Sequence, residues 1–272
     1  MATLTEVIFY SLIGGVFSLI GGFLLISNKR KADLLSTYAT PFAAGALLAA
    51  AFLDLLPEAS HVGDIEKALG FTLVGILAFF LLERFLRVFH HHHDHDDEHQ
   101  DEAPASMIII GDTLHNFIDG IAIASGFLID VQTGVVVTLA VAAHEIPQEV
   151  GDFGLLLKKG LSKKSVIKVN ILSALASTFA AGLFYTLGDS VDLDLSIVLG
   201  IISGMFIYIA VSDIIPSIHK HEENQIAGPQ TILLILGAII VGTVSSYLHG
   251  FIDNEDDHNH SHSYINNDQE RI

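Results

Sequence analysis

The chain begins MATLTEVIFYSLIGGVFSLIGGFLLISNKRK (residues 1–31), an apolar run over 5–27 that ends in a basic cluster. About 20 apolar residues in a helix are enough to cross roughly 30 Å of hydrocarbon. No basic region precedes the run, and no small-residue cleavage site follows it. We therefore expect a first membrane helix here rather than a removed signal peptide.

Apolar runs of similar length recur along all 272 residues, which are 51% hydrophobic and 16% charged. They cover roughly 5–27, 38–58, 69–89, 107–128, 132–157, 166–188, 195–218 and 229–250. Their short connections leave no room for a separate soluble domain. The sequence predicts an all-α, polytopic membrane protein in which eight transmembrane helices form one domain over 1–272.

The basic residues predict the orientation, because cytoplasmic loops of membrane proteins carry an excess of Lys and Arg. An external N-terminus leaves only Lys67 and Arg271 outside among the 13 Lys and Arg residues. We therefore expect both termini outside, and a cell membrane (inner or plasma membrane) as the location.

Composition argues against several kinds of binding site and cross-link. The net charge of −18 argues against nucleic acid, and the absence of cysteine excludes thiolate metal sites and disulfides. Nothing in the sequence indicates an organic cofactor. The lipid bilayer is the expected surrounding, and the oligomeric state is left open, with a homodimer among the candidates.

Two polar clusters interrupt the apolar helices expected at 107–128 and 132–157, namely HNFIDG (115–120) and HEIPQE (144–149). At ~1.5 Å per residue both fall near the bilayer centre, and the short link between the helices makes them antiparallel neighbours. Residues four apart share a helix face, so two polar stripes are expected to meet. The candidate metal ligands are His115, Asn116, Asp119, His144, Glu145, Gln148 and Glu149.

Energetics favours ion handling over simple helix packing. Each ionised group at the bilayer centre costs ~3 kcal/mol on insertion scales, whereas Ser or Thr would join helices at far lower cost. Imidazole, carboxylate and amide ligands without thiolate suit Zn, Fe, Mn, Co or Cd. Pro147 has no amide to donate to the carbonyl of Ala143, which predicts a kink beside the site.

Two segments are rich in His and acidic residues. The loop at 90–105 is expected on the cytoplasmic side, solvated and able to bind metal. Its candidate ligands are His90, His91, His92, His93, His95 and His99. The tail at 251–272 is expected outside, where it would either gather cations or be inert.

The motifs GDTLHNFIDGIAIA and HEIPQEVGDFGLLLKKG resemble the fourth- and fifth-helix signatures of the ZIP (Zrt/Irt-like) metal transporters, and LLPEA (55–59) resembles the end of their second helix. The resemblance implies a transporter rather than an enzyme. It implies uptake of a divalent metal, zinc above all, with Cd, Fe, Mn and Co as further candidates, toward the cytoplasm. The implied site is binuclear and lies between the fourth and fifth helices.

The resemblance assigns ligand roles by position to His115, Asn116 and Asp119, then to His144, Glu145 and Gln148, with Glu149 closing the motif. The related branch of the family usually has a second His where this chain has Gln148. An amide is a weaker ligand, so we expect the two metal positions to bind unequally.

A possible inverted repeat relates LDLLPE (53–58) to SDIIPS (212–217), because each places an Asp three residues before a Pro. The two helices run in opposite directions, and inverted repeats accompany alternating access. Our hypothesis places Asp54 and Glu58 at the outer entrance and Asp213 at the inner exit. Asp112 and Asp152 are further path candidates, and simple capping of helix ends is an equally open interpretation.

Two rival functions remain. HEIPQ nearly spells the His-Glu-x-x-His motif of metalloproteases, but Gln148 replaces the second His and no other His lies at that spacing from His144. A metal sensor, in which the 90–105 loop detects the ion and the helices only anchor it, would not explain paired polar stripes within the membrane.

Overall fold

A computed structural model of the chain describes residues 2–88, 105–188, 194–220 and 228–247, and every regular element in these ranges is a helix. The α-helices are α1 (Leu4–Ser27), α2 (Lys29–Ala49), α3 (Leu56–Val62), α4 (Ile65–Val88), α5 (Ala105–Ile129), α6 (Val131–Lys158), α7 (Lys163–Gly188), α8 (Leu195–Tyr208) and α9 (Ile215–Lys220). Two π-helical segments, η1 (Ala50–Leu55) and η2 (Ile209–Ile214), connect α2 to α3 and α8 to α9. A last helix spans Gly228–Tyr247.

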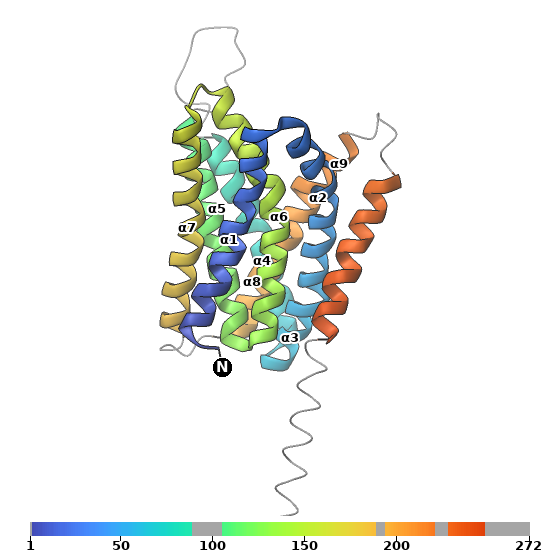
Figure 1. The fold of residues 1–272 in the computed structure, drawn as a ribbon. Coiled ribbons are helices and arrows are strands. Elements are labelled where there is room, and N and C mark those ends of the chain that lie inside the picture. The colour runs from blue at the N-terminus through green and yellow to red at the C-terminus, as the bar shows by residue number, and fades with distance from the viewer. Residues whose placement is uncertain (1, 89–104, 189–193, 221–227, 248–272) are drawn as a thin grey trace, which may run out of the picture.

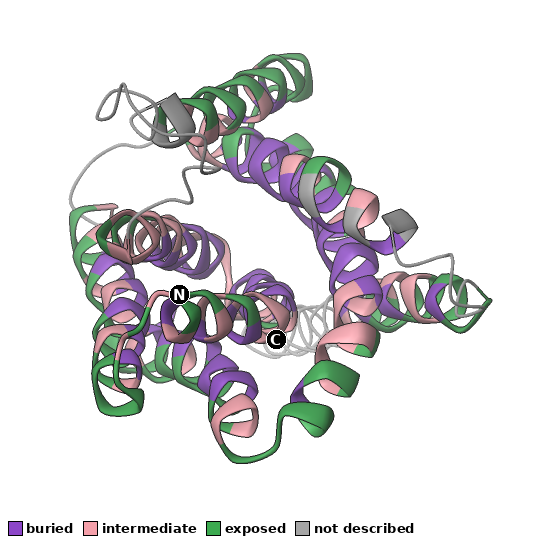
Figure 2. Ribbon diagram, turned by 90° about the horizontal axis from the view of Figure 1, so that it is seen from above, coloured by how far each residue is buried: buried purple, intermediate pink, exposed green. Residues whose placement is uncertain are grey.

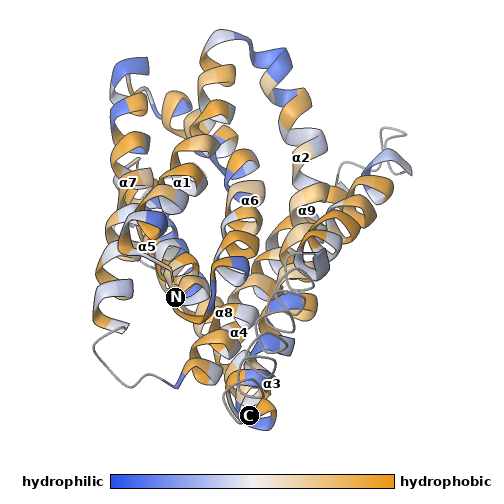
Figure 3. Cartoon of the chain, turned by 60° about the horizontal axis from the view of Figure 1, so that its bottom comes forward, coloured by the Kyte–Doolittle hydropathy of each residue, from blue (hydrophilic) through white to orange (hydrophobic). Residues whose placement is uncertain are grey.

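The predicted all-α, polytopic membrane class is confirmed. Within the described ranges, seven helices are long and apolar enough to cross a membrane, counting α2, η1 and α3 as one. Helix α6 is long enough, with 28 residues, but polar residues near its middle lower its hydropathy. Figure 3 shows mostly hydrophobic helices, with hydrophilic segments interrupting α5 and α6.

The long helices alternate in direction (Figure 1). The α1–α2 turn, the α6–α7 connection and α9 lie at the upper end, whereas the N-terminus, α3 and the α5–α6 turn lie at the lower end. Lys29, Arg30, Lys31, Lys158 and Lys159 belong to the upper connections, so we call this end the basic end. The segments at 90–105 and 251–272 lie outside the described residues.

One predicted boundary is wrong. The second helix starts at Lys29 rather than near 38, because Asn28 caps it by accepting a hydrogen bond from the Lys31 amide at 3.2 Å. Hydropathy marks the part of a helix that lies in hydrocarbon, whereas capping marks where the helix begins. The polar first turns of α2 therefore extend beyond the apolar run.

The helices form two bundles. The site bundle contains α1, α5, α6 and α7, and the second bundle contains α4, α8 and the continuous α2–η1–α3 helix. The last helix packs on α2 in the second bundle. The bundles meet chiefly where α2 lies against α6. Figure 2 shows buried residues on the helix faces that point inward and exposed residues on the outer faces, where lipid would lie.

Glycines allow unusually close helix contacts in both bundles. A Cβ on Gly120 would lie 2.0 Å from the backbone oxygen of Ser177, and one on Gly204 would lie 2.1 Å from that of Thr72. Small residues at helix interfaces let backbones approach closely in membranes. Gly120 follows Asp119 directly, so this contact fixes the distance of α7 from the candidate ligands.

The two stretches proposed as an inverted repeat each overlap a π-helical segment. Asp54 is the fifth residue of η1 (AAFLDL), and Asp213 is the fifth residue of η2 (IAVSDI). Each segment leads into a short helix with Pro as its second residue. The short helices α3 and α9 lie at opposite ends of the molecule (Figure 1).

An ion pair joins the two main helices of the second bundle at the end opposite the basic end. The Lys67 ammonium in α4 donates to the carboxylate of Asp194, the residue before α8. This contact, together with the Ser196 hydroxyl, lowers the pKa of Asp194 to about 2. The carboxylate therefore stays charged at any pH at which the protein would function.

We expect Gly120→Ala to destabilise the protein by about 1–3 kcal/mol, because the added methyl group must push apart two helix backbones. Gly70→Ala is the matched control, since nothing lies within 4 Å of its Cβ position, and alanine there improves helix propensity. The stability of both variants is measured by following the loss of the helical circular dichroism signal on heating in detergent. Equal melting temperatures would contradict the close contact.

Candidate metal centre

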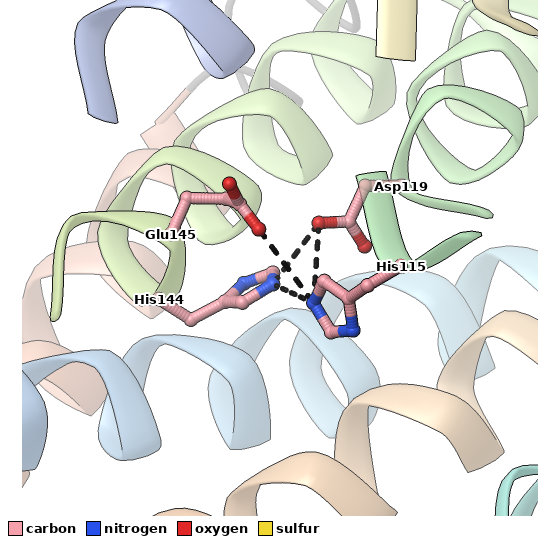
Figure 4. A group of neighbouring side chains, drawn as sticks. All are labelled: His115, Asp119, His144 and Glu145. Carbon is pink, nitrogen blue, oxygen red and sulfur yellow. Dashed lines mark hydrogen bonds and ion pairs between the residues drawn. The ribbon is translucent and has the colours of Figure 1, made fainter. Parts of the chain in front are cut away.

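Four side chains from the middle of α5 and α6 converge on one point (Figure 4). His115 and Asp119 come from α5, and His144 and Glu145 from α6. One ligand atom from each lies within 4.8 Å of the others. We call these four residues the cluster. The prediction that the two polar stripes meet is confirmed for these residues.

The spacing of the cluster fits a small cation. His144 Nε2 lies 3.1 Å from Asp119 Oδ2 and 3.2 Å from His115 Nε2. His115 Nε2 lies 3.6 Å from Glu145 Oε1 and 3.7 Å from Asp119 Oδ2. Four ligands placed tetrahedrally at the usual zinc bond lengths would be separated by roughly 3.3–3.4 Å. The donor atoms therefore already have nearly the separations that such an ion requires.

The His144 ring is oriented by its own helix. Its Nδ1 lies 3.0 Å from the backbone oxygen of Ala140, which can only accept. In the neutral ring Nδ1 therefore carries the proton, and Nε2 presents a lone pair to the cluster. Because Asp119 Oδ2 is also an acceptor, a cation between the two atoms would turn a repulsive contact into an attractive one.

Several buried side-chain oxygens in the cluster and on nearby residues of α5 and α6 have no hydrogen-bond partner. Among the described side chains they include both carboxylate oxygens of Asp119, Glu145 and Glu149, and Oδ1 of Asn116. The four residues are at most 1% exposed. Unpartnered buried carboxylates are strongly unfavourable, and a divalent cation is the simplest group that would satisfy several at once.

The second bundle contributes the aromatic wall of the site. The ring of Phe79 in α4 lies edge-on to His115, with centroids 6.0 Å apart, and that of Phe206 in α8 lies 6.3 Å from His144. These rings hold the imidazoles in place without offering ligands. Both phenylalanines come from apolar helices, so no sequence pattern distinguished them.

A cavity of about 640 Å³ lies between the bundles and reaches His115 and His144. Its wall includes Thr37 in the first half of α2 and Leu155 in the last turn of α6. The start of α2 and the end of α6 lie at the basic end (Figure 1). Carboxylates of Glu83, Asp112 and Asp152 also line it. The cavity therefore connects the cluster with the basic end of the molecule.

The remaining predicted ligands lie around the cluster rather than in it. Gln148 lines the cavity, Glu149 is fully buried, and Asn116 donates to Asp112 Oδ1 at 3.0 Å. The helix continues through Pro147, which also lines the cavity.

The residues predicted to line the entrance and exit of the ion lie in different environments. Asp112 and Asp152 line the cavity. Asp54 is buried, and its Oδ1 accepts a hydrogen bond from Ser245 at 2.7 Å. Glu58 is half-buried in the first turn of α3, and Asp213 lies in η2, with its side chain outside the described set. The six candidate loop histidines, His90 to His93, His95 and His99, lie outside the described residues.

Sequence reasoning missed polar residues on the other helices. Ser173 of α7 accepts from Asn116 Nδ2 at 3.4 Å. The Tyr208 hydroxyl in α8 donates to Glu83 Oε2 in α4 at 2.5 Å. A single Ser or Tyr in an apolar helix gives no periodic signal, so only the packing of the helices shows these contacts.

Comparison with known proteins identifies the family. The sequence model described as "ZIP Zinc transporter" matches residues 4–106 and 90–245. The chain belongs to the ZIP zinc transporter family. Helices α5 and α6, which carry the cluster, lie entirely within the second matched segment.

Three relatives illustrate the family. Zinc transporter ZIP13 of Pongo abelii is 31% identical over 222 residues, which cover 76% of this chain and 66% of that protein. Zinc transporter foi of Drosophila melanogaster is 39% identical over 137 residues, which cover 50% of this chain and 19% of that protein. Human zinc transporter ZIP4 is 38% identical over 142 residues, which cover 48% of this chain and 22% of that protein. The matched regions thus span between a fifth and two thirds of these relatives.

We expect Zn²⁺ to raise the melting temperature of the purified protein, because a ligand that binds only the folded state stabilises it by about 2.7 kcal/mol at 100 times its dissociation constant. Asp119→Ala should remove most of this rise, since the oxygen 3.1 Å from His144 Nε2 is lost. Asp33→Ala, at an exposed carboxylate of α2, is the control. The same rise in all three proteins would place the responsible site elsewhere.

Proposed function

We propose that the protein carries divalent metal ions, zinc above all, across the membrane through the cluster between α5 and α6. The observation that supports this most is the convergence of two imidazoles and two carboxylates from two helices, with separations of 3.1–3.7 Å. Membership of the zinc transporter family supports the same proposal.

We infer a second metal position beside the first, rich in oxygen ligands. Its candidate atoms are Asn116 Oδ1 and the carboxylates of Glu145 and Glu149, all buried without hydrogen-bond partners. Gln148 lies on the cavity side, so it is better placed to meet an ion that is leaving than to complete either position. Because imidazole binds zinc more strongly than an amide oxygen does, the two positions would hold the ion unequally.

The cavity supports a direction of release. It opens toward the basic end, and the excess of Lys and Arg would place that end in the cytoplasm. An ion bound at the cluster would then face the cytoplasm in this conformation. Uptake across an inner or plasma membrane is the transport direction that we propose, with a second conformation giving access from the other side.

The chemistry of release follows from the cavity wall. Asp112 and Asp152, which line the cavity, are carboxylates that would stabilise a departing cation in steps. Conduction requires binding that is favourable enough for entry and weak enough for exit. A sequence of oxygen ligands beyond the two imidazoles provides that decrease in affinity.

Metal uptake into proteoliposomes tests the proposal, with Zn, Cd, Mn, Fe and Co supplied one at a time. Wild type is expected to take up zinc, and His115→Ala or Asp119→Ala to abolish uptake while the protein still folds, because each removes a ligand of the cluster. Asp33→Ala should transport like wild type. No uptake of any ion by folded wild type would refute the proposal.

The same proteoliposomes distinguish transport from the two rival functions, an intramembrane protease and a metal sensor. Cleavage of a peptide by wild type or by Gln148→His would favour an intramembrane protease. A metal sensor predicts no flux at all, so flux that continues after deletion of residues 90–99 would exclude it.

The proposed orientation can be tested with single cysteines, because the natural chain has none. Leu155→Cys, in the cavity wall, should react with a membrane-impermeant maleimide only from the cytoplasmic side of cells or vesicles. Glu66→Cys, exposed at the start of α4 at the opposite end, should react only from outside. Reversed labelling of the two variants would overturn the orientation.

A further inference from the structure

The amide of Asn116 is held in one orientation by groups that the sequence motifs do not include. Its nitrogen Nδ2 lies 3.0 Å from Asp112 Oδ1 and 3.3 Å from the Asp112 backbone oxygen, both on α5. The third contact comes from α7, where Ser173 Oγ lies 3.4 Å away. Both Asn116 and Ser173 are 1% exposed, so water does not compete for these contacts.

The chemistry of these neighbours determines which end of the amide faces them. The backbone oxygen and the carboxylate of Asp112 are acceptors only. The hydroxyl oxygen of Ser173 accepts from Asn116 Nδ2 at 3.4 Å. A reversed amide would place its oxygen against the two acceptor oxygens of Asp112. The amide oxygen must therefore point away from α7.

That oxygen has no other use within the described residues. Asn116 Oδ1 is buried and lacks a hydrogen-bond partner, although an amide oxygen in such a place normally finds one. The neighbouring residue His115 and Asp119, one turn further along α5, belong to the cluster. The fixed amide thus leaves a buried, unpartnered oxygen on a residue that lies between His115 and Asp119 along α5.

We propose that Ser173 of α7, together with Asp112, is a positioning residue that fixes the Asn116 amide with its oxygen available to the transported cation. This inference rests on the proposed transport function. It gives α7 a role in metal affinity although Ser173 itself contacts no ion. The close packing of α7 on α5 at Gly120 keeps the hydroxyl within reach.

The test compares matched serine variants in zinc uptake by the full-length protein. Ser173→Ala should lower kcat/KM about tenfold, mainly by raising KM, because losing a partner that orients a metal ligand typically costs 10–100-fold in affinity. Ser173→Thr keeps the hydroxyl and should restore most of the loss. Ser125→Ala is the control, since that buried hydroxyl on α5 donates only to the Ile121 carbonyl at 2.7 Å.

A double-variant cycle separates orientation from general packing. In an Asn116→Asp background a carboxylate offers an oxygen on either side, so Ser173→Ala should cause little further loss. The zinc concentration that gives half of the rise in melting temperature provides a second readout for any variant that folds but transports poorly. Both readouts should show the same non-additivity.

The outcomes distinguish the two proposals. If wild type does not transport zinc, the proposed function fails. If wild type transports zinc and Asp119→Ala does not, but Ser173→Ala behaves like Ser125→Ala, only the positioning role is overturned. An equal loss from Ser173→Ala in both backgrounds would also overturn it, because the hydroxyl would then act independently of the amide.

Discussion

The structure depends on the burial of several acidic side chains close together. Asp119, Glu145 and Glu149 are almost completely buried, and none of their side-chain oxygens has a hydrogen-bond partner. A soluble protein would place a basic side chain or water beside such groups, and here two imidazoles approach instead. Such an arrangement is unfavourable without a cation, so we expect the stability of the centre to depend on the divalent ion that we propose it binds.

The rest of the fold serves this centre in two ways. The site bundle brings α5, α6 and α7 close enough for backbone contact at glycine, which sets the positions of the ligands to within small tolerances. The second bundle contributes only aromatic rings and the far wall of the cavity. The candidate ligands thus come from one bundle, and the cavity that reaches them depends on how the other bundle lies against it. We therefore expect a change in that packing to alter access to the cluster without moving the candidate ligands apart.

Much of the fold could be predicted from the sequence, because the hydrocarbon thickness imposes a length on each apolar run. The meeting of HNFIDG and HEIPQE also followed from helix spacing, and the structure brings His115, Asp119, His144 and Glu145 together. The sequence could not separate these four from Asn116, Gln148 and Glu149, since all share polar chemistry and similar spacing. The contact from Ser173 depends on which face α7 presents to α5, and single-chain periodicity does not determine that.

The π-helical segments have a consequence for helical phase. An α-helix turns by about 100° per residue, and a π-helical turn contains one residue more than an α-helical turn because its hydrogen bonds run from residue i to i+5. Everything beyond η1 or η2 is therefore rotated relative to a continuous α-helix. Asp54 in η1 and Pro57 in α3 therefore face a different direction from the one they would face if α2 continued as a regular α-helix. Aligning the α2–η1–α3 or α8–η2–α9 helix with an uninterrupted α-helix would therefore need a gap of one residue. The direction that the residues after each π-helical segment face is set by this extra residue, not by a change in composition.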